Sequence, residues 1–364
     1  MQLNLGIDIG FGDVKVIAKG DGSLLRYKFP SAIKADTMRG LGLSIVDENM
    51  DITEKYALLL NGQQIFIGNG IMGKIGSSQS IGTEKSKKDY LILTAATLGM
   101  IAADYEVDNV DVALTLGFPL KSSKDFKRRI VNDILSLAEV TLQNMITNRN
   151  KTIRINVQHV YSLSQGIGAF ISELGLAISD GYDTVRSESA HYLKESTLII
   201  DIGNNVINSL YVAPGFKVNE DFSRAYYQVG VVQAIDMIQS ELQERGLPLD
   251  RRTVQEDILK MNPVEYEGIT DIRDIRNEAI KNAWERYTGK TIEDIITKIS
   301  IKNVKPPKTI VFYGGGTILF KSFIKERFIP KFNHIISNNP VFANAKGFYI
   351  WTKYKKELNK IKNQ

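Results

Sequence analysis

Two short segments of the chain place an aspartate and closely spaced glycines directly after an apolar run. The first reads Gly6-Ile-Asp8-Ile-Gly10-Phe11-Gly12-Asp13-Val-Lys15, and the second reads Leu198-Ile-Ile-Asp201-Ile-Gly203-Asn204-Asn205. A glycine turn after a strand can present backbone N–H groups to phosphate, and its aspartate can hold magnesium through water. The aspartates are 193 residues apart (201 minus 8), which predicts two similar halves that each supply one turn.

A third glycine segment follows the apolar run 309–313. It consists of Gly314, Gly315, Gly316 and Thr317. A glycine triplet after a buried strand lets the backbone approach a ligand closely, although it can also be a simple flexible turn. Either aspartate alone could likewise be an ordinary turn residue. The ordered set of three segments favours a site for a nucleotide, whose base and sugar the triplet would support.

Composition narrows the function classes. The chain has 364 residues, 43% of them hydrophobic and 24% charged, which is ordinary for a soluble protein with two cores. It contains no cysteine, which excludes disulfides and thiolate chemistry and is in keeping with a cytoplasmic protein. No apolar run approaches the roughly 20 residues needed to span a bilayer. The three histidines are scattered without metal-ligand spacing, and the net charge of +5 is too mild to predict nucleic-acid binding.

The pattern of apolar residues predicts a mixed α/β chain. Strands are expected from Leu3 into the first turn and over residues 14–18, 24–29, 64–67, 110–116, 153–160, 198–201, 206–212 and 309–313. Helices are expected over residues 89–105, 126–137, 165–175, 231–245 and 272–299. The continuous apolar run 110–116 predicts a strand in a sheet covered on both faces, and residues 186–194 a polar surface loop.

Two further segments have alternative interpretations. Small residues on one face of the helix that starts at Gln165 predict close approach of another backbone, as in a helix that joins two domains. The C-terminal tail places Trp351, Tyr354, Leu358 and Ile361 on one helical face with lysines opposite. It could lie on a membrane surface, but we favour a last helix that packs back on the first domain.

The order of these segments resembles the actin, sugar-kinase and heat-shock-chaperone ATPase superfamily over essentially the whole chain. The first turn, Phe29-Pro30-Ser31, Gln165-Gly-Ile-Gly168 and Phe342-Ala-Asn-Ala-Lys-Gly347 look most like prokaryotic actin-like proteins, those of the plasmid-segregation (ParM) type and their archaeal relatives. The resemblance implies a duplicated, ribonuclease H-like two-domain fold with a nucleotide cleft between the domains. Domain I would be residues 1–164 completed by the helix 346–364, and domain II residues 165–345.

The resemblance also implies a role for individual residues. Asp8 and Asp201 would organise magnesium and its waters, and Gln165 would orient the water that attacks in hydrolysis. The nucleotide-binding residues would be Gly10, Phe11, Gly12 and Lys15 at the first turn, Gly203, Asn204 and Asn205 at the second, and Gly314, Gly315, Gly316 and Thr317. From its own pattern Lys15 could also face solvent, and Gln165 could be only a helix-cap residue.

Two positions depart from the family pattern. Asn208 stands where relatives usually have Asp or His, so it can form a hydrogen bond but cannot accept a proton, and hydrolysis is expected either to be slow or to rely mainly on Gln165. Phe11 stands where conventional actin has a small hydroxyl residue, which removes one contact to the γ-phosphate.

The function implied is an ATPase, or else a GTPase, that polymerises into nucleotide-dependent filaments and serves plasmid DNA segregation. Its partners would be further copies of itself and an adaptor protein bound to plasmid DNA, without a membrane. Two alternatives remain open: a sugar or metabolite kinase on the same fold, and a cytoskeletal protein of cell shape or division.

Overall fold

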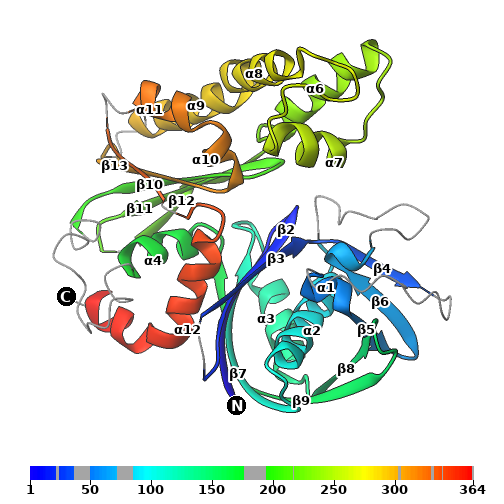
Figure 1. Cartoon of the computed structure of the whole chain (residues 1–364). Helices are drawn as coiled ribbons and strands as arrows, with labels where there is room; N and C mark the ends of the chain where they lie inside the picture. The colour runs from blue at the N-terminus through cyan, green and yellow to red at the C-terminus, as the bar shows by residue number, and fades with distance from the viewer. Residues whose placement is uncertain are drawn as a thin grey trace. The chain divides into compact units, whose positions relative to one another are not determined.

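The computed structural model describes residues 1–21, 24–36, 50–71, 85–175, 194–215, 217–301, 305–328, 332–337 and 339–362 (Figure 1). The chain divides into two compact units. The first comprises Met1–Gly175 and Asn344–Ile361, and the second Leu176–Ala343 and Lys362–Gln364. Helix α4 (Ile167–Gly175) belongs to the first unit, whereas the resemblance places residues 165–175 in the second domain.

The first unit is built on a nine-stranded sheet in the order β3-β2-β1-β7-β9-β8-β5-β6-β4. The strands are β1 (Gln2–Ile9), β2 (Asp13–Lys19), β3 (Leu25–Pro30), β4 (Ile33–Asp36), β5 (Tyr56–Leu60), β6 (Gln63–Ile67), β7 (Asn109–Phe118), β8 (Glu139–Asn144) and β9 (Asn150–Ser164). Strand β7 pairs in parallel with both β1 and β9. Its side chains Val112, Leu114 and Leu116 on one face are fully buried, and Ala113 and Thr115 on the other face are buried as well, so the prediction of a strand covered on both faces is confirmed.

Helices pack on both faces of this sheet. They are α1 (Ile52–Lys55), α2 (Lys87–Asp104), α3 (Lys124–Leu135), α4 and α12 (Ala343–Lys362), with a 3₁₀ turn over Gly68–Ile71. Figure 1 shows α2 and α3 on one side and α4 and α12 on the other. A Cβ on Gly6 would lie 2.1 Å from the carbonyl oxygen of Ala345, so strand β1 touches α12 directly.

The start of α12 confirms the interpretation that the last helix packs on the first domain. The Thr352 hydroxyl is buried in α12 and donates to the carbonyl oxygen of Leu5, 2.8 Å away. The Phe348 ring lies against Gly117, where a Cβ would be 2.3 Å from the ring. The side chains of Leu358 and Ile361 lie outside the described residues.

The second unit repeats the plan with five strands in the order β12-β11-β10-β13-β14. These are β10 (Thr197–Ile202), β11 (Val206–Ala213), β12 (Lys217–Tyr227), β13 (Thr309–Tyr313) and β14 (Asn333–Ile336). The helices are α6 (Val232–Glu244), α7 (Arg251–Thr253), α8 (Ile272–Ala283), α9 (Gly289–Ile301), α10 (Gly315–Leu319) and α11 (Lys321–Phe328). Two π-helical segments, Val254–Lys260 and Trp284–Thr288, follow α7 and α8, so the helix expected over 272–299 is interrupted.

The two sheets share their topology. In each, three antiparallel strands are followed by two further strands in parallel, which corresponds to β3-β2-β1-β7-β9 in the first unit and β12-β11-β10-β13-β14 in the second. The predicted duplication of the fold is thereby confirmed.

Some elements are not apparent from the sequence, and one prediction cannot be followed. The apolar pattern does not indicate β4, β5, β8, β12 or β14. Within the predicted loop 186–194, residues 186–193 lie outside the described residues. No helix in the described part of the chain is long and apolar enough to cross a membrane.

Candidate functional site

The first turn, residues 8–13, links β1 to β2. The Gly10 N–H donates to the carbonyl oxygen of Asp13 (2.9 Å), and the Ser31 N–H donates to the carbonyl oxygen of Gly12 (2.8 Å). A Cβ on Gly10 would lie only 2.8 Å from the carbonyl oxygen of Asp13, so the closed turn requires glycine there.

The second turn, residues 201–206, has the same closure at the offset of 193 residues. The Gly203 N–H donates to the carbonyl oxygen of Val206 (2.9 Å), and the Gln228 N–H to the carbonyl oxygen of Asn205 (2.8 Å). A Cβ on Gly203 would lie 2.9 Å from the carbonyl oxygen of Val206. Hydrogen bonds therefore confirm what the two Asp-x-Gly motifs predicted, a structural repeat.

Four backbone N–H groups stand out at these turns. Within the part of the chain that the structure describes, no hydrogen bond is made by the N–H of Phe11, Gly12, Asn204 or Asn205. The carbonyl groups of the second turn are in contrast engaged: the N–H of Val231 donates to Gly203, and that of Val232 to Asn204. Successive N–H groups at a turn form a concave donor surface that suits a phosphate oxygen.

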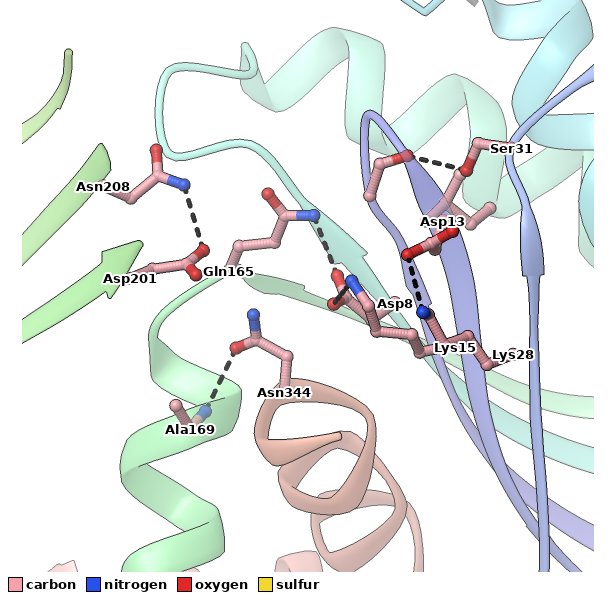
Figure 2. Close-up of polar contacts among 12 residues, drawn as sticks. Asp8, Asp13, Lys15, Lys28, Ser31, Gln165, Ala169, Asp201, Asn208 and Asn344 are labelled. Atoms are coloured by element: carbon pink, nitrogen blue, oxygen red, sulfur yellow. Dashed lines mark hydrogen bonds and ion pairs between the residues drawn. The ribbon is translucent and has the colours of Figure 1, made fainter. Parts of the chain in front are cut away.

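Asp8 is the second-last residue of strand β1, where the first turn begins, and it is buried, with 4% of its surface exposed. Its Oδ1 accepts a hydrogen bond of 2.9 Å from Nε2 of Gln165, and its Oδ2 lies 3.9 Å from Nζ of Lys15 (Figure 2). The structure thus brings together three of the predicted residues from β1, β2 and the end of β9.

Gln165 is held in place through its backbone and through its neighbours. Its N–H donates to the carbonyl oxygen of Phe118 (2.7 Å). Oδ1 of Asn344, on α12, accepts from the N–H groups of Gly166 (3.0 Å) and Ala169 (3.1 Å) at the start of α4. Asn344 therefore caps the helix that begins just after Gln165. Nothing in the sequence pattern assigned this residue a role.

The small residues of α4 allow the close approach that was predicted. A Cβ on Gly347 of α12 would lie 1.6 Å from the carbonyl oxygen of Gly168. The partner of the small face is therefore α12, which packs against α4 within the first unit.

At the second turn, Asp201 is contacted by Asn208. Nδ2 of Asn208 donates to Oδ2 of Asp201 over 3.2 Å (Figure 2). Gly314, at the end of β13, has a φ of +90°, and a Cβ there would lie 2.3 Å from Oδ1 of Asp201. The first glycine of the triplet is therefore needed both for its backbone conformation and for the close contact with the aspartate.

The other members of the triplet differ in their surroundings. Gly315 is exposed, with no atom within 4 Å of an added Cβ, whereas a Cβ on Gly316 would lie 2.4 Å from Cγ2 of Ile202. The hydroxyl of Thr317 is buried and donates to the carbonyl oxygen of Tyr313 (2.6 Å) inside α10. A contact between Thr317 and a nucleoside stays a prediction, and the hydroxyl already has a partner.

Lys85 contacts the first turn, and sequence reasoning missed it. Its Nζ donates to the carbonyl oxygens of Ile9 (2.9 Å) and Gly10 and lies 5.2 Å from the centre of the Phe11 ring. Burial lowers the pKa of Lys85 from its ordinary 10.5 to about 7, with Asp8 opposing this shift and Lys15 adding to it. The only nearby signal in the sequence is Ser86, which caps α2 and marks where that helix begins.

The carboxylates of the two turns are suited to hold magnesium only when a phosphate-bearing ligand is bound as well. Among the described residues, no group of three Asp, Glu, His or Cys side chains could hold a metal ion by itself. Mg²⁺ is usually bound by one or two carboxylates together with water and substrate phosphates. Asp8 and Asp201, each at a turn with N–H groups that suit phosphate, fit that kind of binding.

Comparisons with known proteins show what this chain is similar to. Residues 6–168 match the family model described as the N-terminal domain of actin-like proteins. No curated protein matches the chain.

Solved structures match over nearly the full length. ParM of Bacillus thuringiensis with ATP is 16% identical with a TM-score of 0.72, and covers 98% of this chain and 99% of its own. A ParM filament from Clostridium botulinum is 21% identical with a TM-score of 0.68, and the match covers 97% of this chain and 99% of that one. An archaeal actin homologue is 19% identical with a TM-score of 0.67, and the match covers 96% of this chain and 98% of that one. The actin-like fold and the resemblance to ParM-type proteins, which the motifs predicted, are thereby confirmed.

Proposed function

We propose that this chain, whose fold is actin-like, is a magnesium-dependent nucleoside triphosphatase that assembles into filaments with copies of itself. The observation that carries the proposal is the duplicated turn. Both turns combine a glycine closure, two N–H groups without a partner in the described chain and an adjacent aspartate. This arrangement suits the phosphates of a nucleotide better than it suits a neutral ligand.

The residues of the two turns have distinct parts in binding. The N–H groups of Phe11 and Gly12, with Lys15, would bind the β- and γ-phosphates, and those of Asn204 and Asn205 would bind at the second turn. Gly314, Gly315 and Gly316 would approach the nucleoside. Asp8 and Asp201 would hold waters of a magnesium ion, which supplies positive charge against the phosphate oxygens when bound.

In the hydrolysis that we propose, a water molecule attacks the γ-phosphorus, and the bond to the β-phosphate oxygen breaks. The protein acts mainly by positioning these groups and by stabilising charge. Gln165 is suited to orient the water because its side-chain amide lies at Asp8 and its backbone is fixed. Asn208 cannot accept the proton of the water, so turnover is expected to be slow.

Filament formation and cellular role are proposed from the relatives. One of the similar structures is a ParM filament, and another is a ParM with ATP. Head-to-tail contacts between identical subunits generate open filaments when the rotation does not close a ring. We infer by the same resemblance that the filament segregates plasmid DNA in the cytoplasm, through an adaptor protein bound to that DNA.

Light scattering together with phosphate release tests the proposal. With magnesium and ATP or GTP, scattering should rise above a critical protein concentration and fall as the nucleotide is consumed. Electron microscopy of the same samples should show filaments with nucleotide and none without it. A protein that binds nucleotide but stays monomeric at tens of micromolar, roughly the range of such contacts, would contradict the filament. Phosphate transfer to sugars would then identify a kinase.

A further inference from the structure

The amine of Lys85 is bound to the first turn from a position far along the chain. It donates to two consecutive carbonyl oxygens, those of Ile9 and Gly10, and it faces the Phe11 ring. The hydroxyl of Ser31 donates to the same Gly10 oxygen over 2.7 Å (Figure 2). Two side chains from outside the turn therefore converge on one carbonyl group.

The equivalent carbonyl of the second turn is held differently. Gly203 corresponds to Gly10 at the offset of 193, and its oxygen accepts the N–H of Val231 over 3.2 Å. The next carbonyl, that of Asn204, accepts the N–H of Val232 at the start of α6. A backbone N–H group thus holds the Gly203 carbonyl in the second half, whereas the side chains of Lys85 and Ser31 hold the equivalent Gly10 carbonyl in the first.

We propose that Lys85 is a positioning residue that fixes the first turn, so that the N–H group of Phe11 is oriented toward the terminal phosphates. A carbonyl and the following N–H belong to the same rigid peptide unit, with the two groups on opposite sides. Holding the oxygens of Ile9 and Gly10 on the Lys85 side therefore turns the N–H groups of Gly10 and Phe11 away from it. This inference rests on the proposed nucleotide site for its functional meaning, but not for its geometry.

The surroundings of the amine explain why a lysine can do this. The charged groups that face it are Asp8 on β1, Asp13 and Lys15 on β2, and Asp89 on α2. An amine donates hydrogen bonds whether or not it carries the extra proton, so the contact with the carbonyl oxygens persists in both states. Lys85→Met nearly keeps the length of the side chain but removes the hydrogen-bond donor, whereas Lys85→Arg keeps both donors and positive charge.

Hydrogen exchange of the unliganded protein tests the positioning directly. The exchange rate of the Gly10 N–H, which closes the first turn, is compared with that of the equivalent Gly203 N–H, which closes the second. We expect Lys85→Met to speed exchange at Gly10 at least tenfold and to leave Gly203 unchanged, with partial rescue by Lys85→Arg. Lys88→Met, at an exposed position in the first helical turn of α2, is the matched control. Unchanged exchange at Gly10, or faster exchange throughout the first unit, would overturn the inference.

Nucleotide affinity supplies the second measurement. Lys85→Met should weaken the binding of ATP and ADP at least tenfold. The affinity for AMP, which lacks the terminal phosphates, should stay within about twofold of the wild-type value. Ser31→Ala should be non-additive with Lys85→Met because both remove a donor to the same oxygen. An equal loss for all three nucleotides would contradict selective positioning of the first turn. If the wild type binds none of them, the proposed function fails, and the exchange at Gly10 still decides the role of Lys85.

Discussion

Asn208 occupies in the second half of the chain the position that Lys15 occupies in the first. Each is the cross-strand partner of the aspartate before its turn, in the pairs Asp8–Lys15 and Asp201–Asn208. Lys15 Nζ lies 3.9 Å from Asp8, and Asn208 donates to Asp201 over 3.2 Å. The cross-strand partner of the first aspartate is thus cationic, and that of the second is neutral. For the nucleotide that we propose, we therefore expect the first turn, with Lys15, to bind the more highly charged end of the triphosphate.

The two aspartates should each be required for the response to nucleotide. A ligand that binds the folded state raises the melting temperature by mass action. With Asp8→Ala or Asp201→Ala, we expect the shift produced by magnesium and ATP to disappear because the magnesium waters lose their acceptor. The measurement is a thermal melt with and without ligand. Asp125→Ala, on the exposed start of α3, is the control and should keep the wild-type shift. Full shifts in both test variants would refute the site.

Replacing Gln165 should separate hydrolysis from binding. Gln165→Ala removes the amide beside Asp8, and the loss of one positioning contact costs on the order of 10²-fold in rate. Nucleotide affinity should stay within a few-fold because the turns are intact. Phosphate release and equilibrium binding are measured together. Gln158→Ala, at an exposed position of the preceding strand, should turn over like the wild type. Wild-type turnover by Gln165→Ala would mean that a group other than Gln165 orients the attacking water.

The glycine triplet offers a test with an adjacent control. Gly314→Ala places a methyl group 2.3 Å from the Asp201 carboxylate, at a φ of +90°. We expect a loss of about 1–3 kcal/mol from backbone strain, and a smaller melting shift with nucleotide because Asp201 must move. Gly315→Ala meets open space and should cost nothing, or stabilise by up to about 1 kcal/mol, since alanine favours helix. Equal stability of the two variants in urea unfolding would contradict this account.

Asn344 should stabilise the start of α4. Its Oδ1 accepts two N–H groups there, so Asn344→Ala should lower the free energy of unfolding by about 0.5–2 kcal/mol, as for the loss of a helix cap. Asn344→Asp keeps the acceptor and should retain most of the stability. Because the cap follows Gln165 directly, turnover should fall more in Asn344→Ala than in Asn344→Asp. Urea unfolding and phosphate release distinguish these outcomes, and an unaffected Ala variant would exclude the cap.

Lys85 should make stability depend on pH. Burial lowers its folded-state pKa to about 7, below the ordinary 10.5, so between these values the unfolded chain binds more protons. Its contribution to stability should therefore increase as pH rises from about 7 to 10, by up to about 1.4 kcal/mol per pH unit. The measured quantity is the difference in free energy of unfolding between wild type and Lys85→Met across this range. A difference that is flat or falls with pH would contradict the lowered pKa.

Local patterns of apolar residues were sufficient to predict many of the strands and helices. The apolar runs that end in Asp8 and Asp201 identified β1 and β10, and helix periodicity found α2 near its true bounds. Strands β5 and β8 are short, and β12 is largely polar with several exposed residues, so each has little apolar alternation to reveal it. The helix expected over 272–299 is interrupted by π-helical turns that periodicity could not predict, because the apolar pattern continues through them.

The sequence by itself determined the two turns, because closure requires glycine at residues 10 and 203 and an aspartate can be recognised beside each. Tertiary structure alone decided what holds them. Lys85 and Ser31 bind backbone carbonyl oxygens of a segment 75 and 21 residues away in the chain, and Asn344 caps a helix 178 residues from itself. Every residue except proline has the same carbonyl and N–H groups, so a side chain that binds them leaves no matching residue type in the sequence. Only the fold brings such partners within hydrogen-bonding distance.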